Sequence, residues 1–534
     1  MSPAQQNASD PLNTPTPGFQ GSRTSGVRVT IYHREWGDDP IIFTGGVTEF
    51  QQLKRSPKGK ATHNSPSLVS VQTFKSIGSA AGTFTLTAKT QNPDPTFIDL
   101  FDELVDDDWV DIEFQNHAQS WHVMRGLIDD VRRSVAVAGS GATTTTFTIS
   151  GRDFGKVWQH TPIWFSIYMK EAINGHFAQE VFTSRPDSSP TRVAGDSLEF
   201  LSPQSAVQGY LFGFLEKLGE AGRENWAPPS SLPGITNGSF VESLYFNTSG
   251  FSNKPARKSL DINFRTQNGT LWDLAQEWSD PMFTEMYVDL LPKGQDGRPS
   301  RTAIVQGDAI GVEESVMTVV YRDKPFPFAN ESGNIEFPKG LDSEWFNLPL
   351  FVVPREFIVS SNIGRGGQER FNAFFVMSTL HQETLGAMPQ LVQPLWNKDD
   401  VLIHGLRRFD VTSKYTALGD ELLGLTEQQR EMVRDWYSMN PYLFNGNLEL
   451  GLGMPDIRVG VRVLIPGPNS PEFNETYYVE SVAHNWSMVP GTRTSLGVTR
   501  GWRGTDEDLI GALSDLVNRY TVEPPSIGQS SSEV

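Results

Sequence analysis

Short runs in which apolar and polar residues alternate follow one another from Val27 onward. Each run is rich in β-branched or aromatic residues, and Gly, Asn or Asp separates it from the next. Several such runs, roughly ten residues apart, are typical of a barrel or a sandwich. They lie at 27–33, 40–50, 82–90, 109–114, 120–131 and 143–154, and a short helix is expected at 95–105.

A second series of the same kind occupies the last third of the chain. Its alternating runs lie at 350–361, 370–379, 447–453, 456–467, 476–486 and 493–502, with an amphipathic helix expected at 423–439. We therefore predict two β-rich domains that share one fold. The first spans residues 25–156, and the second spans 345–505 and carries a helical insertion.

The pattern changes to a helical period between these domains. Apolar residues at i, i+3 and i+4 predict helices at 163–182 and 206–222, and a Pro-rich loop follows within 223–255. Strands are expected at 285–292 and 302–308, so residues 157–344 form a predicted α/β middle domain. An extended arm at 1–24, and a C-terminal helix with a flexible tail at 506–534, complete the organisation.

One helix of the middle domain has clear boundaries, from Leu271 to Ser279. Thr270 is its candidate N-cap, Asp273 occupies the third helical position, and Pro281 follows the end. Its apolar residues recur at i, i+3, i+4 and i+7, which predicts one buried face. That face consists of Leu271, Leu274, Ala275 and Trp278.

Two turns are predicted in the second β-rich domain. Asn445-Gly446 favours a tight turn, because both residues tolerate positive φ. Pro455 presets φ for another turn, which directs Arg458 back along the following strand. Arg458 would then be either a structural hydrogen-bond clamp or a contact between subunits.

Composition narrows the functional classes. The 534 residues contain no cysteine, which excludes disulfides, thiolate metal sites and cysteine nucleophiles. The net charge of −19 opposes stable binding to a phosphate backbone. No run of apolar residues is long enough to cross a membrane, and the first residues do not resemble a signal peptide, so synthesis in a cytoplasm without membrane insertion is expected.

A search for catalytic and metal-binding motifs finds none. The nine histidines form no metal-like cluster, and no serine-nucleophile motif is present, so we predict no enzyme activity, no metal and no cofactor. Acidic residues are dense between Phe97 and Phe114, where Asp106, Asp107 and Asp108 are typical of a solvated loop. A glycan hydrolase needs only two positioned carboxylates, and it stays open as an alternative.

The β-rich segments resemble bacteriophage tail baseplate hub proteins. The stretch from Tyr477 to Trp502, YYVESVAHNWSMVPGTRTSLGVTRGW, is similar to the closing strands of that family, a YVESV-type strand and a Thr-rich strand ending in TRG. Further motifs follow in the family's order over most of residues 25–505. They are GTFTLTAKT (82–90), DDDWVDIEF (106–114), TFTISGRDFGKVW (146–158), GTLWDLAQEWSD (269–280), MTVVYRDKPF (317–326), PREFIVSSNIGRGGQERFNAFFV (354–376), LIHGLRRFD (402–410) and GNLELGLGMPDIRVGVRVLI (446–465).

The resemblance implies a homotrimer in which each chain supplies two tube-like β-barrel domains, so that three chains form a pseudo-sixfold ring. Such a hub joins a hexameric tail tube to a central spike, with wedge or sheath-side proteins around it, in the tail baseplate of the virion. Double-stranded DNA passes through the ring during ejection without being held. Asp106, Asp107 and Asp108 are then candidates for lining the pore. The hub of a related contractile injection particle would fit the same resemblance.

Overall fold

The computed structural model describes residues 25–46, 67–163, 207–247, 269–293, 315–378 and 393–522, with gaps inside these ranges. The predicted arm at 1–24, the strand at 302–308 and nearly all of the helices at 163–182 and 206–222 lie outside the described residues. Much of the Pro-rich loop also lies outside them. Within the described part, the chain is mainly β, as the alternation of the sequence predicts.

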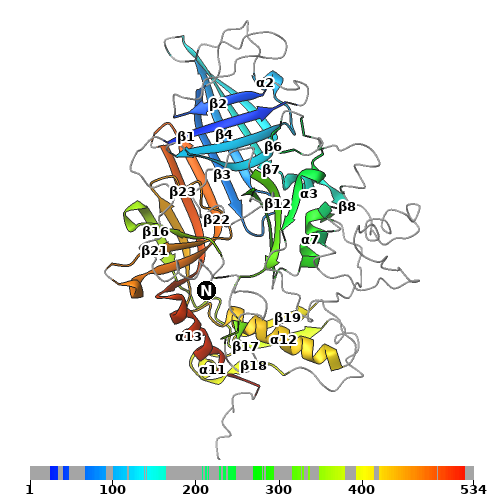
Figure 1. Cartoon of the computed structure of the whole chain (residues 1–534), viewed down its shortest axis with the longest axis vertical. Helices are drawn as coiled ribbons and strands as arrows, with labels where there is room; N and C mark the ends of the chain where they lie inside the picture. Colours follow the sequence, from blue (N-terminus) through cyan, green and yellow to red (C-terminus); the bar gives the residue numbers. More distant parts are fainter. Residues whose placement is uncertain are drawn as a thin grey trace, which may run out of the picture.

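One sheet of thirteen strands forms the centre of the molecule (Figure 1). Seven strands come from the first β-rich block and are called the N-terminal half-sheet, with the order β2-β1-β5-β6-β7-β4-β3 and antiparallel neighbours throughout. Their bounds are β1 Ser25–Tyr32, β2 Ile41–Gly45, β3 Ser67–Ser76, β4 Thr83–Gln91, β5 Trp109–Asn116, β6 Gln119–Val137 and β7 Thr143–Asp153. The predicted helix at 95–105 is reduced to α2 (Leu100–Glu103) in the described residues.

The other six strands are called the C-terminal half-sheet, with the order β15-β21-β22-β23-β20-β16. The short turn η5 (Arg355–Phe357) connects β15 directly to β16, so the two outermost strands of this half-sheet are consecutive in the chain. Their bounds are β15 Leu350–Val352, β16 Ile358–Gly364, β20 Phe444–Leu450, β21 Arg462–Ile465, β22 Glu475–Ser487 and β23 Gly491–Arg503.

The two half-sheets share one strand order. The series β1-β5-β6-β7-β4-β3 corresponds in turn to β15-β21-β22-β23-β20-β16, and each half-sheet is followed by a helix, α3 (Lys156–His160) or α13 (Asp506–Val517). Two differences exist: β2 has no counterpart, and β1 is antiparallel to β5 whereas β15 is parallel to β21. This common order is what two equivalent domains require.

A single apolar core joins the half-sheets. It contains buried residues from both, such as Val29 and Ile112 from the first and Val463 and Leu496 from the second. Burial of alternate residues along the strands supplies this core, as in β7, where the odd-numbered positions from Thr145 onward are buried. The half-sheets are therefore packed against each other through a shared interior.

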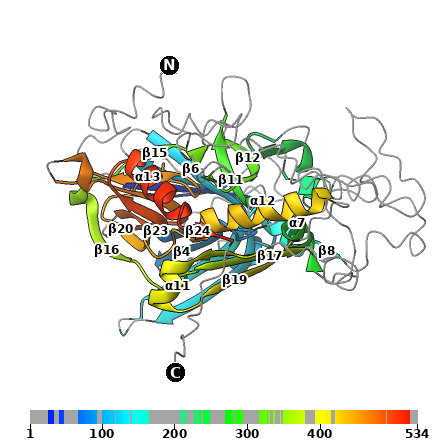
Figure 2. The ribbon, with the colours of Figure 1, turned by 90° about the horizontal axis from the view of Figure 1, so that it is seen from below.

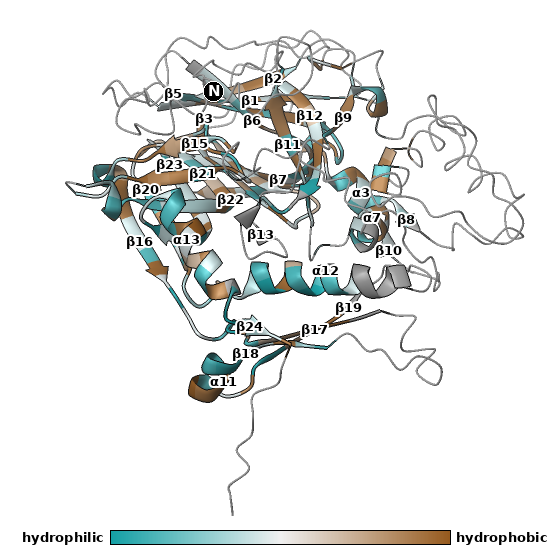
Figure 3. Cartoon of the chain, turned by 60° about the horizontal axis from the view of Figure 1, so that its bottom comes forward, coloured by the Kyte–Doolittle hydropathy of each residue, from teal (hydrophilic) through white to brown (hydrophobic). Residues whose placement is uncertain are grey.

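The middle domain packs a three-stranded sheet against the N-terminal half-sheet. Its strand order is β11-β12-β9, with bounds Thr284–Pro292, Ser315–Asp323 and Leu244–Asn247. Every residue of β11 is buried, and Figure 3 shows the hydrophobic colour of β11 and β12. Short elements beside this sheet are β8 (Pro162–Ile163), β10 (Gly269–Thr270) and η2 (Val241–Ser243).

Helix α7 spans Leu271–Ser279, as predicted, and has the predicted cap. The Thr270 hydroxyl accepts a hydrogen bond from the backbone N–H of Asp273 (3.2 Å), and the Asp273 carboxylate accepts one from the backbone N–H of Thr270 (2.9 Å). Leu271, Leu274 and Ala275 are buried, which confirms that part of the apolar face. The side chain of Trp278 lies outside the described residues.

An insertion between β16 and β20 forms a small separate layer. A four-stranded sheet, β19-β17-β18-β24, packs on the long helix α12 (Asp420–Tyr437), which crosses the molecule in the view from below (Figure 2). The C-terminal segment returns to this layer through α13 and β24. Remaining bounds are β13 Phe328–Ala329, β14 Ile335–Glu336, β17 Ala373–Ser378, β18 Leu395–Asn397, α11 Lys398–His404, β19 Arg408–Ser413, η6 Pro471–Phe473 and β24 Tyr520–Thr521.

Asn445-Gly446 does not form the predicted tight turn. Both residues belong to β20, where Asn445 lies opposite Gly364 and a bulge separates Phe444 from Gly446. A Cβ atom at Gly446 would lie 1.9 Å from the backbone oxygen of Asn362, so the close approach of β16 requires the glycine. The turn prediction is wrong because a bulge uses the same residue types.

Candidate functional site

The two half-sheets meet where β3 pairs with β22. Seven residues of β3, from Ser70 to Ser76, lie opposite Ser487 to Ser481 in antiparallel register. This junction is possible because β22 is long: only Glu475–Tyr478 pairs with β21 on that side, and the remainder of the edge accepts β3. Two backbone hydrogen bonds extend the junction, from Ile77 N–H to the Glu480 oxygen (2.9 Å) and from Met488 N–H to the Val69 oxygen (3.3 Å).

The strand equivalent to β22 in the N-terminal half-sheet is β6, and it has the same kind of edge. Its first part, Gln119–Leu127, pairs with β5, and Gly126–Val137 pairs with β7 on the opposite side. Beyond Ile128, no strand in the described part of the chain pairs with the β5 side. Helix α2 contacts β6, and the Arg133 guanidinium lies 5.0 Å from the centroid of the Phe101 ring. We therefore call only residues Ser134–Val137 on this side the free edge of β6.

The strand equivalent to β3 in the C-terminal half-sheet is β16, which ends the large sheet. It pairs with β20 on one side only, among the described strands, and lies at the outside of the molecule in Figures 1 and 2. Five of its seven residues are exposed. The molecule therefore has one occupied junction and two matching edges that no described strand occupies.

Equivalence of the half-sheets extends to their irregularities. A bulge follows Leu68 in β3 and Ile358 in β16, and another follows Ile128 in β6 and Val479 in β22. Because the bulges of β3 and β16 correspond, Ser70 of β3 occupies the same position as Ser360 of β16.

The turn before β5 matches the turn before β21 in the same way. Asp107 (φ 65°) donates its N–H to the Ile128 oxygen at 2.9 Å, and Gly460 (φ 73°) donates its N–H to the Val479 oxygen at 2.8 Å. Aspartate is one of the few non-glycine residues that adopt this left-handed conformation at low cost. The common bulges and turns therefore define which residues correspond.

The acidic run 106–108 forms this turn. Asp106 is exposed, Asp107 is partly exposed and its carboxylate lies 2.6 Å from the Lys156 ammonium, and Asp108 is fully buried. The Asp108 carboxylate accepts a hydrogen bond from the Val105 N–H (3.1 Å). The burial of Asp108 argues against a pore-lining role for this residue, and the expectation for Asp106 and Asp107 stays a prediction.

Arg458 lies buried where the second half-sheet meets the first. The turn at Pro455 forms as predicted, with the Ile457 N–H donating to the Met454 oxygen at 3.1 Å. The guanidinium donates to the backbone oxygens of Val123 (2.8 Å) and His122 (2.5 Å) in β6. These contacts are within one chain, so Arg458 occupies the position of a clamp between the half-sheets.

Further buried charges surround this clamp, and sequence reasoning did not identify them. The Lys75 ammonium lies 3.2 Å from an Asp289 carboxylate oxygen and 3.5 Å from one of Asp153, and Asp289 also lies 3.8 Å from Arg458. Burial raises the pKa of Asp153 to about 6, although Lys75 opposes the shift. This cluster joins both half-sheets to β11 of the middle domain.

A serine, a histidine and an aspartate form a chain of hydrogen bonds nearby. Nδ1 of His122 lies 2.5 Å from the Ser315 hydroxyl, and Nε2 lies 3.0 Å from the Asp111 carboxylate, which also accepts from Arg125 at 2.7 Å. A hydrolytic triad joins the same three residue types, although its histidine uses Nε2 for the serine and Nδ1 for the aspartate. The serine, histidine and aspartate side chains are at most 4% exposed, so no substrate reaches the serine, and the chain of bonds instead attaches β12 to the N-terminal half-sheet.

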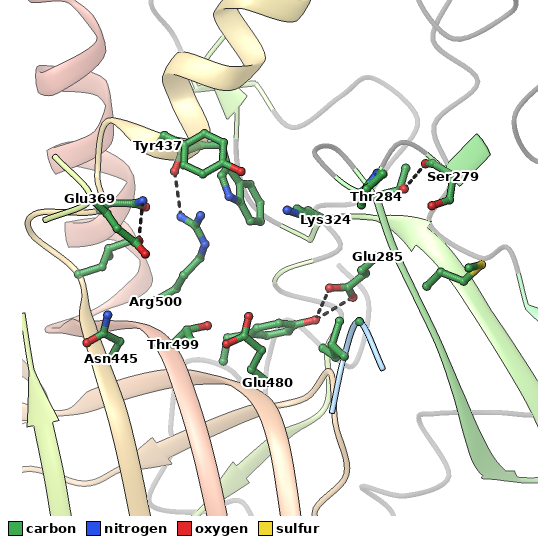
Figure 4. A pocket seen from close by; sticks show the side chains of 18 of the residues that line it. Ser279, Thr284, Glu285, Lys324, Glu369, Tyr437, Asn445, Glu480, Thr499 and Arg500 are labelled. Atoms are coloured by element: carbon green, nitrogen blue, oxygen red, sulfur yellow. Dashed lines mark hydrogen bonds between the residues drawn. The ribbon is translucent and has the colours of Figure 1, made fainter. Parts of the chain in front are cut away.

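A cavity of about 510 Å³ lies between the C-terminal half-sheet, the middle domain and the insertion (Figure 4). Three glutamates contribute to its lining. Glu285 pairs with Arg322 and accepts from the Tyr478 hydroxyl at 2.7 Å, and Glu369 accepts from Asn440 at 3.2 Å. Burial raises the pKa of Glu480. Arg500 and Trp436 also line the cavity, and the Arg500 guanidinium lies 3.7 Å from the centroid of the Trp436 ring.

Among the described residues, no group of three or more metal-ligating side chains could hold an ion. None of the helices in the described part combines the length and apolar character of a membrane span.

No family model and no curated protein sequence matches the chain. Among solved structures, it is similar to a tail protein from Neisseria meningitidis MC58, with 12% identity and a TM-score of 0.42 over 89% of this chain and 96% of that one. It is also similar to the 43 kDa tail protein of prophage MuSo2 from Shewanella oneidensis, with 10% identity and a TM-score of 0.41 over 89% of this chain and 98% of that one.

A third similar structure is an Escherichia coli component of the type VI secretion system that is described as structurally similar to two bacteriophage T4 tail proteins. It is 6% identical, with a TM-score of 0.37 over 83% of this chain and 77% of that one. Two of these neighbours are thus described as tail proteins, and the third is described as similar to tail proteins. Their TM-scores lie below 0.5, so the likeness is loose and assigns no role to any residue or surface.

Proposed function

We propose that the chain is the structural hub of a phage-type tail baseplate, a homotrimer whose six half-sheets form a pseudo-sixfold ring. The observation that carries the proposal is the common strand order of the two half-sheets, including equivalent bulges and turns. A hexameric tube needs six similar units to contact. Three chains with two such units each supply them, and a closed ring satisfies every interface.

The partners follow from the sequence resemblance to hub proteins. The ring joins the tail tube on one side to a central spike on the other, and wedge or sheath-side proteins surround it in the virion. Double-stranded DNA passes through during ejection. The excess of acidic over basic residues, 63 against 44, supports passage without stable binding.

The mass of the purified assembly tests the proposal. Light scattering coupled to gel filtration should give three times the 59.4 kDa of one chain. Electron-microscopic class averages should show a ring with six similar lobes. A chain that remains a monomer at the highest soluble concentration, or a closed assembly of another order, would contradict the hub.

The alternatives differ in what they require. A hub of a contractile injection particle would keep the same trimer and the same ring, so neighbouring genes for capsid proteins would separate it from a phage hub.

A glycan hydrolase would need two free carboxylates facing a substrate cleft. In the cavity of Figure 4, Glu285 interacts with Arg322 and Tyr478. The candidate carboxylates for such a cleft are therefore Glu369 and Glu480. Release of soluble sugar from cell-wall glycan by the purified chain would favour that alternative.

A further inference from the structure

We infer that β16 of one copy pairs in antiparallel register with the free edge of β6 in a second copy. This contact repeats between chains the β3–β22 junction that already exists within each chain. The inference rests on the proposed ring and adds to it the strands and the register that join neighbouring copies.

The register follows from the equivalence of the half-sheets. The bulges place Ser360 at the position of Ser70, and they place Ala136 at the position of Ser487. Ser70 lies opposite Ser487 within the chain, so Ser360 of one copy lies opposite Ala136 of the next. Counting from this pair places Ser361 opposite Val135, and it places the bulged residue Val359 beside Val137 at the end of the paired segment.

Exposed apolar side chains occupy both edges at these positions. Val135 is 58% exposed, Val137 is 67% exposed and Val359 is 60% exposed. Val135 and Val137 lie on the same face of β6, because alternate residues of a strand share a face. Val359 is the bulged residue of β16, so this alternation does not extend to it. Pairing therefore buries a set of β-branched residues that each copy alone leaves in water.

A cavity beside β16 provides room for the partner strand. Within the chain, the Trp486 ring lies opposite Val71 and packs over Gly45, where an added Cβ would approach it to 2.2 Å. The equivalent place beside β16 is a cavity of about 540 Å³, whose lining includes Ser361 and Ile363. The residue equivalent to Trp486 is Val135 of the second copy, which the register directs to this cavity.

Strand edges are seldom left open in soluble proteins, because their unpaired N–H and C=O groups attract other chains. Here the two edges differ from one another, so the contact is heterologous, and a heterologous contact forms a closed ring or an open filament. The occupant of β16 is thus a second copy of this chain, bound through β6.

Cysteine cross-linking tests the register without interference, because the chain has no native cysteine. The double variant Ser361→Cys/Val135→Cys should form interchain disulfides on oxidation, since directly opposite residues have Cβ atoms close enough for a disulfide. Denaturing gels should show linear products of two and three chains and a closed product of three. Each single variant should remain uncross-linked.

The matched control moves one cysteine by one residue. Ser361→Cys/Ser134→Cys places the two thiols on opposite faces of the joined strands, so it should cross-link far less. Equal cross-linking of both double variants would indicate random collision and would overturn the inferred register.

The outcomes separate the inference from the proposed function. If the Ser361→Cys/Val135→Cys variant is a trimer by mass but does not cross-link, the hub stands and the strand pair is overturned. Cross-linking that continues beyond three chains supports the strand pair and contradicts the trimeric ring. A chain that neither assembles nor cross-links at its highest soluble concentration contradicts both.

A second variant uses no cysteine. Val137→Lys/Val359→Lys places two like charges beside each other at the contact and should shift the assembly to monomers, with an unchanged circular dichroism spectrum. Leu402→Lys, at a position 76% exposed on α11, is the control and should leave the assembly intact. Assembly that survives the double lysine variant would argue against the contact.

Discussion

At the scale of single residues, the molecule is notable for charges buried where its parts meet. Lys75, Asp153, Asp289 and Arg458 come from three different units and neutralise one another away from water. Removing one partner of such a group leaves an uncompensated charge, which destabilises a protein far more than the intact group stabilises it. Their value lies in specifying how the half-sheets and the middle domain dock.

Asp153 makes this docking sensitive to pH. Its pKa is raised from 3.8 to about 6, so the folded state binds the proton more tightly than the unfolded state does. The free energy of unfolding therefore falls as the pH rises through this window, by about 3 kcal/mol for the full shift. Asp153→Asn should remove this contribution, which urea denaturation midpoints between pH 4 and pH 7 would measure.

The slope should be reduced and not abolished, because burial also raises the pKa of Asp456 to about 6. Asp410→Asn, at an exposed position, serves as the control and should keep the slope of the unmodified protein. Identical slopes for Asp153→Asn and the unmodified protein would show that Asp153 does not titrate in this window.

At the scale of elements, sequence patterns predicted those strands and helices whose formation depends on residues close together in the chain. Most period-two runs became strands of the half-sheets, but the run at 370–379 became β17 of the insertion, and β3 was not among the predicted runs. The Thr270 cap and the apolar spacing after it predicted α7 from its first residue to its last. Asn445-Gly446 misled because its chemistry suits a bulge as well as a turn.

Contacts between distant segments could not be predicted in this way. Thr73 lies 411 residues from the His484 carbonyl that accepts its hydrogen bond, and Ser315 lies 193 residues from His122. No pattern in one sequence connects such positions. The junction, the buried cluster around Lys75 and the free edges are therefore properties of the folded chain, although the resemblance to hub proteins indicated that two similar domains would be present.

Helix α7 should behave as part of the core. Leu274 is 6% exposed and belongs to the apolar cluster between the middle domain and the N-terminal half-sheet. Leu274→Ala should lower the free energy of unfolding by roughly 2–5 kcal/mol, because it leaves a cavity. The matched change Leu402→Ala, at an exposed position, should alter it by less than about 0.5 kcal/mol. Thermal denaturation of both variants makes the comparison, and equal melting temperatures would contradict the packing.

At the scale of the whole molecule, net charge governs how the assembly meets DNA. Each chain carries −19, and counterion release by Lys and Arg is the main source of non-specific affinity for a duplex. We expect no binding of a fluorescent DNA duplex at physiological ionic strength, measured by anisotropy. Affinity that rises steeply as salt is lowered would instead indicate a hub that grips DNA.

The insertion between β16 and β20 would lower the symmetry of the proposed ring from sixfold to threefold. The equivalent connection in the N-terminal half-sheet, from β3 to β4, is only a short turn at residues 77–82. A ring of alternating half-sheets would therefore carry the insertion at every second position. Such a ring would contain six half-sheets but only three copies of the insertion. One protein would therefore present six similar binding sites to a sixfold tube and three to a threefold spike.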